Sequence, residues 1–302
     1  MVSRRRFVQL ASLALLETAS LVTAGNILPR VSSQPIEEYF AQSESSSAKQ
    51  SSKIYLGVYD LRPTNGKIDA PSIVSKLESA HINFYNYLII NNPADWNLFP
   101  NFLELTQAKN MDVIVTLRPP SEPPISAPYG YDWPKWAEEL TELSKSRTNL
   151  IGFTIDDFFY NFRHHDGHNK SIVGMMEKMK EMDSQLTFLP TLYEWQAPDF
   201  KKCYGNMTDG VLIYPDTFNS AAIDPNEILW KTKIAQTKKD FSKVFVGIYA
   251  SPLYLGMTAD KVRQKTLIAY DSNPTGIVQF RPPWSGGAIW DTITEVYSKC
   301  NK

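Results

Sequence analysis

Two consecutive aspartates, Asp156 and Asp157, follow the apolar run at residues 150–155. Their residue type and spacing make them the strongest candidates in the chain for acid and base catalysis. Adjacent side chains of an extended strand point to opposite faces, so both carboxyl groups can enter one pocket only where the chain bends. Carboxylates held close repel each other, which raises one pKa and keeps a proton on that acid. One anion beside one acid is what glycosidic cleavage requires. The alternative is that one aspartate caps the following turn and the other is solvated.

The chain around this pair alternates short apolar runs with segments of helical period from residue 53 onward. This alternation is typical of a parallel sheet with crossover helices. The predicted strands cover residues 54–59, 83–89, 112–117, 150–155, 186–191, 210–214, 244–249 and 276–280. The predicted helices cover residues 70–81, 97–109, 133–145, 172–182, 227–239, 259–270 and 287–299, and residues 199–206 form a weak fifth connection.

Eight strand and helix units in about 250 residues predict an α/β fold, a single (β/α)₈ TIM barrel. An open doubly wound sheet is the alternative architecture. No glycine-rich phosphate loop follows the first predicted strand, where residues 60–65 read Asp-Leu-Arg-Pro-Thr-Asn. Dinucleotide binding is therefore disfavoured, and we predict no cofactor.

Charge and composition narrow the class of partner. The chain has 302 residues, and its 31 Lys and Arg nearly balance its 32 Asp and Glu, for a net charge of −1. No overall positive field would attract nucleic acid, so a nucleic-acid partner is disfavoured. The low net charge agrees with a neutral glycan or glycoside as the substrate. The aromatic fraction of 12% suits a protein that stacks rings on its ligand, although a large core would also use such rings.

Function in a barrel gathers where the strands end, because the loops after them converge on one face. The residues at the predicted strand ends are carboxylates, amides, arginines, tyrosines and tryptophans, which suit a sugar site. The alternative is that the rim is polar only because it is exposed to solvent. We predict substrate-binding roles for Tyr59, Tyr87, Asn91, Arg118, Tyr193, Glu194, Trp195, Tyr214, Asp216, Tyr249, Gln279, Arg281 and Trp284.

Four short motifs at four strand ends resemble one known family. The strand that ends in Asp156-Asp157 resembles the catalytic strand of O-GlcNAcase- and hyaluronidase-type β-N-acetylglucosaminidases, family 84 of the glycoside hydrolases. Residues 57–59, 83–87 and 186–193 resemble further motifs of that family in the same chain order. The resemblance covers roughly residues 54–195.

The resemblance implies hydrolysis of β-linked N-acetylhexosaminides by a substrate-assisted retaining mechanism. The sugar's own acetamido oxygen attacks the anomeric carbon, so the protein supplies no nucleophile. Asp156 would then orient and polarise the acetamide N–H, and Asp157 would act first as general acid and then as general base.

The chain also departs from the family. Ile90, Asn91 and Asn92 stand where the family has a lysine and two aspartates, and Asp60 replaces a glycine. These departures leave a non-catalytic carbohydrate-binding barrel open.

A glycosidase of another family is a further alternative. The strand at residues 152–158 is similar to the chitinase strand, but Phe158 stands where the chitinase acid would be. A separate pair of carboxylates would join Asp157 to Glu194 or Asp216, at about 5 Å for a retaining enzyme and about 6.5–9.5 Å for an inverting one.

The N-terminal residues predict export. Residues 3–9 read Ser-Arg-Arg-Arg-Phe-Val-Gln, which matches a twin-arginine-type signal, and the apolar stretch that follows is too short to span a membrane. We predict a signal peptide at residues 1–25, a Ser-rich linker at 26–52 and the catalytic barrel at 53–302. The expected location is periplasmic or otherwise extracytoplasmic, with an uncleaved amphipathic anchor as the alternative.

Metal-ligating residue types occur in a pattern that does not favour a metal. Three histidines and an aspartate lie within residues 164–168, but neighbours in a loop lack the rigid spacing of a tetrahedral site. We therefore predict no metal, with a metal-dependent hydrolase as the alternative. Cys203 and Cys300 are predicted either to pair after export or to remain as buried thiols.

Overall fold

The computed structural model describes residues 54–62, 68–90, 92–162, 166–205, 207–208, 210–215, 227–252 and 256–301. All of them belong to one compact unit within residues 47–302. The predicted signal peptide and linker lie outside the described residues and stay predictions. Asn91, Asp216, His164 and His165 also lie outside them.

The sheet consists of nine parallel strand segments in the order β5-β4-β3-β2-β1-β9-β8-β7-β6. β1 pairs with both β2 and β9, so the first and last strands of the chain are neighbours. The segments are β1 (Tyr55–Tyr59), β2 (Phe84–Ile89), β3 (Asp112–Leu117), β4 (Leu150–Ile155), β5 (Thr187–Phe188), β6 (Thr191–Tyr193), β7 (Gly210–Tyr214), β8 (Lys243–Tyr249) and β9 (Gly276–Phe280).

The two short segments β5 and β6 correspond to the single strand predicted at 186–191. β5 pairs with β4 and β6 pairs with β7. Between them, the Leu189 N–H donates to the Phe153 carbonyl at 2.9 Å, and the Pro190 carbonyl accepts from the Leu212 N–H at 3.1 Å. Pro190 has no N–H to donate, so the strand is interrupted there. Because this strand bonds to both neighbours, the sheet closes, and the predicted (β/α)₈ barrel is confirmed.

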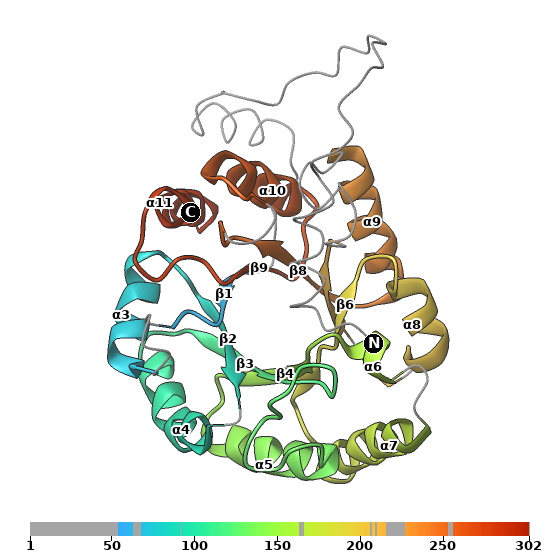
Figure 1. The fold of residues 1–302 in the computed structure, drawn as a ribbon. Helices are drawn as coiled ribbons and strands as arrows, with labels where there is room; N and C mark the ends of the chain where they lie inside the picture. Colours follow the sequence, from blue (N-terminus) through green and yellow to red (C-terminus); the bar gives the residue numbers. More distant parts are fainter. Residues whose placement is uncertain are drawn as a thin grey trace, which may run out of the picture. The chain divides into compact units, whose positions relative to one another are not determined.

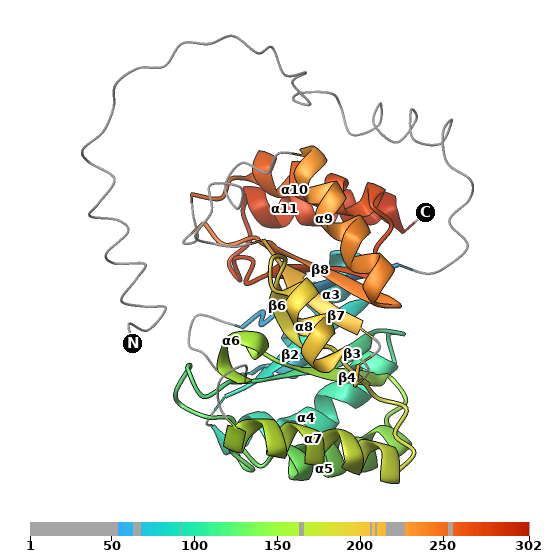
Figure 2. The same cartoon turned by 90° about the vertical axis from the view of Figure 1, so that its right-hand side faces the viewer.

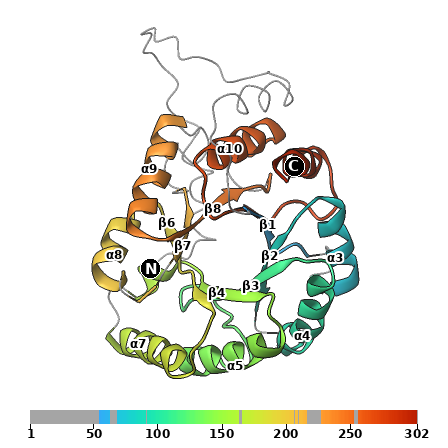
Figure 3. The ribbon, with the colours of Figure 1, turned by 180° about the vertical axis from the view of Figure 1, so that it is seen from behind.

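Helices alternate with the strands and surround them (Figures 1 and 3). In the side view, α9, α10 and α11 lie on one side of the strands, and α4, α5 and α7 lie on the other (Figure 2). The helices are α3 (Ala70–Ser79), α4 (Pro93–Gln107), α5 (Trp133–Ser146), α6 (Phe158–Phe162), α7 (Asp166–Glu181), α8 (Ala197–Tyr204), α9 (Glu227–Asp240), α10 (Ala259–Asp271) and α11 (Ala288–Cys300).

Two of these helices differ from expectation. The weak fifth connection is a regular helix, α8, and the five-residue helix α6 was not predicted at all. None of the helices in the described part of the chain has the length and apolar character needed to cross a membrane.

Four turns that lead from a helix into the next strand contain a residue with left-handed φ that is not glycine. A left-handed residue after the last helical turn reverses the chain and satisfies exposed carbonyl groups. Asparagine and aspartate tolerate this conformation better than most residues. The four positions are His81 (φ 56°), Asn110 (φ 55°), Asp183 (φ 49°) and Asn273 (φ 48°).

The barrel interior is lined by aromatic side chains near the amino ends of the strands and by polar side chains nearer their carboxyl ends. The rings of Tyr55, Phe84 and Phe245 have centroids 5.2–5.6 Å apart. The polar layer contains two hydrogen-bonded pairs, Thr116 with Asn86 at 2.5 Å and Thr154 with Thr191 at 2.8 Å. Strand alternation then places Asp156, two residues beyond Thr154, on the same inward face.

Gly247 in β8 leaves room for the Tyr214 ring on β7, because a Cβ at this position would overlap that ring. We expect Gly247→Ala to lower the free energy of unfolding by about 1–3 kcal/mol, the usual cost of overpacking a core. Gly174→Ala in α7 is the matched control, since its methyl would lie 3.5 Å from Pro134. A glycine inside a helix costs roughly 0.5–1 kcal/mol relative to alanine, so the control should be more stable. Urea unfolding measures both, and equal effects would contradict the packing argument.

The two cysteines are free thiols. Cys300 in α11 is buried, and burial raises the pKa of its thiol to about 12. Cys203 in α8 is exposed, so the alternative of two buried thiols is wrong for this residue.

Candidate active site

The two aspartates sit where β4 ends at the carboxyl end of the barrel. The Asp156 N–H still bonds to the Leu117 carbonyl of β3 at 3.0 Å, and its side chain is buried. Asp157 leaves the strand with a left-handed φ of 42°, and its N–H donates to Asp156 Oδ1 at 3.1 Å. The chain therefore bends between the two residues, and Asp157 is half-buried where Asp156 is buried.

Tyr59, the last residue of β1, contacts Asp156 across the barrel interior. Its hydroxyl lies 3.4 Å from Asp156 Oδ2, a long hydrogen bond of the kind that active sites tighten when substrate binds. Burial raises the pKa of the Tyr59 hydroxyl, and the negative charge of Asp156 raises it further. Tyr59 therefore stays protonated and donates to the carboxylate.

Four rings at the ends of β1, β7, β8 and β9 pack together, and we call them the aromatic cluster: Tyr59, Tyr214, Tyr249 and Phe280. Tyr59 stacks on Phe280 with centroids 4.9 Å apart and planes at 14°. Tyr214 and Tyr249 lie 5.5 Å apart, and their centroids lie 5.8 Å and 5.5 Å from that of Phe280. Three predicted site tyrosines are thus brought together, and through Tyr59 they adjoin Asp156. Phe280 was not predicted.

Helix α6 starts directly after Asp157 and supports the bend. Its Asn161 donates from Nδ2 to the Asp157 carbonyl at 2.7 Å and accepts the Ser121 N–H at 2.9 Å. Phe158 is fully buried and stacks on Phe162 at 4.6 Å. The position at which chitinases carry an acid therefore belongs to the core here. No sequence motif predicted that Asn161 would hold the bend at Asp157.

The loop after β3 adds a charged pair beside this site. Arg118 Nη2 lies 3.9 Å from Glu122 Oε2, and both side chains are about one-fifth exposed, at 21% and 19%. The same loop reaches the site through the Ser121 N–H, which donates to Asn161 of α6, and the charge of Glu122 is among the influences that raise the pKa of Tyr59. Arg118 was predicted to line the site, and Glu122 was not.

Two predicted site residues face the helices instead of the interior. The Tyr87 ring packs 4.7 Å from Phe99 in α4, and its hydroxyl donates to the Asp95 carbonyl at 2.8 Å. Gln279 is fully buried, and its Nε2 donates to Thr266 Oγ1 in α10 at 2.9 Å. Both side chains therefore bond on the outer side of the sheet, and the structure does not bring them together with Asp156.

The remaining predicted residues lie at the end of β6 and in the loops. Tyr193 ends β6 and Glu194 follows it, both half-buried, and Trp195 beside them is 49% exposed. Trp284 lies over Lys76 of α3, with 5.6 Å from Nζ to the ring centroid. Among the residues that the structure describes, no group of three or more His, Cys, Asp and Glu could hold a metal ion.

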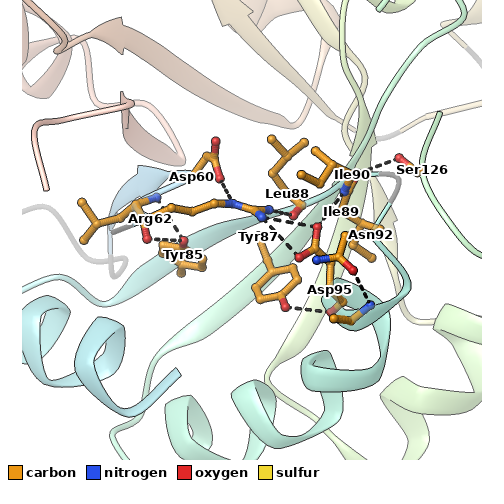
Figure 4. A network of polar contacts seen from close by, with 12 residues as sticks. Asp60, Arg62, Tyr85, Tyr87, Leu88, Ile89, Ile90, Asn92, Asp95 and Ser126 are labelled. Carbon is orange, nitrogen blue, oxygen red and sulfur yellow. Dashed lines mark hydrogen bonds and ion pairs between the residues drawn. The ribbon is translucent and has the colours of Figure 1, made fainter. Parts of the chain in front are cut away.

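A buried polar network joins the ends of β1 and β2 (Figure 4). Arg62 donates from Nε to Asp60 at 2.5 Å and from Nη1 to both carboxylate oxygens of Asp95 at 3.2 and 3.3 Å. Burial alone would lower the pKa of the Arg62 guanidinium, but Asp60 and Asp95 outweigh burial and raise the pKa. Asp95 also accepts the Ile90 N–H at 3.1 Å. Arg62 is thus held by two carboxylates, and its side chain is 11% exposed.

Comparisons with known proteins agree on the class of fold. Neither a protein-family model nor a curated protein matches the chain. GH5_18 from Streptomyces cattleya, solved in complex with GlcNAc, has a TM-score of 0.62 at 10% identity over 82% of this chain and 80% of that one. A GH5_18 variant from Bifidobacterium longum subsp. longum, solved with Manb1-4GlcNAc, has a TM-score of 0.62 at 11% identity, over 82% of this chain and 78% of that one. A chitinase from Chromobacterium violaceum has a TM-score of 0.51 at 10% identity, over 80% of this chain and 98% of that one.

Fold and site together define a (β/α)₈ barrel with paired aspartates at its carboxyl rim. At identities this low the likeness shows the fold alone, a barrel of the kind that glycoside hydrolases use. The comparisons do not single out family 84.

Proposed function

We propose that the protein is a glycoside hydrolase that cleaves β-linked N-acetylhexosaminides by a substrate-assisted, retaining mechanism. The observation that carries the proposal is the arrangement at the end of β4, where buried Asp156 and half-buried Asp157 follow each other across a left-handed bend. The neighbours solved with GlcNAc and with Manb1-4GlcNAc support the choice of substrate class.

In this mechanism the two carboxyl groups have different tasks. A carboxylate presents about four acceptor positions, enough for the Asp157 N–H, the Tyr59 hydroxyl and a substrate amide N–H. Asp156 would therefore hold the 2-acetamido group so that its oxygen attacks the anomeric carbon. Asp157, which is more exposed, would protonate the leaving oxygen and then deprotonate the attacking water. Trp195, which is 49% exposed beside Glu194, would provide a ring face for the apolar side of the sugar.

The test is a comparison of two chromogenic substrates that differ at one position. We expect the p-nitrophenyl β-N-acetylglucosaminide to be cleaved at least about 10³-fold faster than the β-glucoside, because only the former carries the internal nucleophile. Proton NMR of the first-formed sugar should show the β anomer.

Other results would identify the alternatives. Equal cleavage of both substrates would favour a nucleophile supplied by the protein. Of the two candidates, Glu194 and Asp216, only Glu194 lies within the described residues. Binding of the sugar without cleavage would favour the carbohydrate-binding barrel.

A further inference from the structure

Neighbouring strands β1 and β9 end in the same way. Each finishes with an aromatic residue, Tyr59 or Phe280, which are partners in the strand register. Each aromatic residue is followed by a charged residue with left-handed φ, Asp60 at 52° and Arg281 at 47°. The Arg281 N–H donates to the Tyr59 carbonyl at 3.1 Å, so the two strand ends are joined directly.

The two pairs make matching contacts. The rings of Tyr59 and Phe280 stack at 4.9 Å, and the next residues form an ion pair with 3.1 Å from Arg281 Nη2 to Asp60 Oδ2. Arg281 Nε donates to the same oxygen at 3.2 Å, and Asp60 Oδ1 accepts from Arg62 at 2.5 Å. Asp60 is thus held by two arginines, with its side chain 9% exposed.

Left-handed backbone costs a residue other than glycine roughly 1–2 kcal/mol, so surrounding contacts must hold it in place. At Asp60 and Arg281 the ion pair between the two side chains is one such contact. The direction of the strand end sets where the Tyr59 ring points, and the ring carries the hydroxyl that reaches Asp156.

We propose that Asp60 and Arg281 are positioning residues for catalysis: their ion pair fixes the adjacent ends of β1 and β9, so that Tyr59 stays stacked on Phe280 and donates to Asp156. The inference rests on the proposed function in so far as Asp156 orients the acetamido group. The placement of Tyr59 itself does not depend on the reaction.

A double-mutant cycle tests whether Arg281 acts through Tyr59. Arg281→Gln and Tyr59→Phe are each expected to lower kcat by about 10- to 100-fold, the loss of one hydrogen bond to a charged group. If Arg281 acts through Tyr59, the double variant should be no slower than Tyr59→Phe alone. Arg281→Lys, which keeps the charge, should recover part of the loss. Multiplied losses in the double variant would overturn the proposal.

A matched control separates positioning from the general loss of an ion pair. Arg263 in α10 pairs with Glu295 in α11 at 2.9 Å, and its side chain is 31% exposed, against 43% for Arg281. Arg263→Gln should leave kcat unchanged.

Crystal structures give a readout that needs no activity. In Arg281→Gln the Tyr59 hydroxyl should turn away from Asp156 Oδ2 and lose this hydrogen bond relative to the wild-type crystal structure, while Arg263→Gln keeps the wild-type distance. An unchanged distance in Arg281→Gln would overturn the positioning role. A wild-type protein that cleaves no N-acetylhexosaminide would contradict the proposed function instead, and the distance would still decide the positioning role.

Discussion

Asp157→Asn is expected to lower kcat for a p-nitrophenyl β-N-acetylglucosaminide by about 10²–10⁴-fold, the usual contribution of a general acid and base. The amide is nearly isosteric with the acid, so the bend after β4 and the hydrogen bond from Asn161 to the Asp157 carbonyl should persist. A substrate with a better leaving group needs less protonation. The loss of kcat/KM, which reports the steps up to departure of the leaving group, should therefore be much smaller for the dinitrophenyl glycoside, and steady-state kinetics on both substrates would measure the difference.

Asp183 provides a matched control for this substitution. It is also an aspartate with left-handed φ, at 49°, but it lies in the turn from α7 into β5, at the amino end of the barrel. Asp183→Asn should leave kcat unchanged. Full activity in Asp157→Asn, or an equal loss of kcat/KM on both leaving groups, would exclude Asp157 as the acid.

Asp95→Ala is expected to lower the free energy of unfolding by about 1–3 kcal/mol, because buried donors of Arg62 lose an acceptor while Asp60 remains as the only carboxylate bound to Arg62. Asp95 is 3% exposed and Arg62 is 11% exposed, so little water can compensate for the loss. The Ile90 N–H would lose its acceptor as well. Urea unfolding measures the change.

The control for Asp95 is an ion pair on the surface. Glu78 and Lys109 lie 2.8 Å apart with side chains 51% and 43% exposed, and such pairs contribute about 0–1 kcal/mol. Glu78→Ala should therefore be nearly neutral. A loss in Asp95→Ala no larger than that of Glu78→Ala would show that the network adds nothing to stability.

The strands were predictable because each is a short apolar run bounded by polar residues, and β3, β4, β7 and β9 have the predicted ends. The break at Pro190 was missed, although proline cannot donate to a ladder and the residue itself was the signal. Helix α6 was missed because its five residues include three phenylalanines and a tyrosine, which have no helical period over so short a span.

Which strand-end residues face inward was harder to predict. Strands of a parallel barrel are buried on both faces, so no polar alternation distinguishes the interior from the side that meets the helices. Tyr59 and Tyr87 therefore look alike in sequence, yet one contacts Asp156 and the other contacts α4. The contact of Asp60 with Arg281 spans 221 residues and depends on closure of the barrel, which places the first strand beside the last.

The residues with left-handed φ occupy two kinds of position, the turns from helices into strands and the carboxyl rim of the barrel. A redesign guided only by stability would treat both kinds alike. Replacement by glycine relieves the backbone cost at any of them. At His81, Asn110, Asp183 and Asn273 the substitution affects only turns between helices and strands. At Asp60, Asp157 and Arg281 the same substitution would delete a charged group of the carboxyl rim. A consensus or thermostabilised version of this barrel should therefore accept glycine at the first four positions and retain the native residue at the other three, where stability is exchanged for activity.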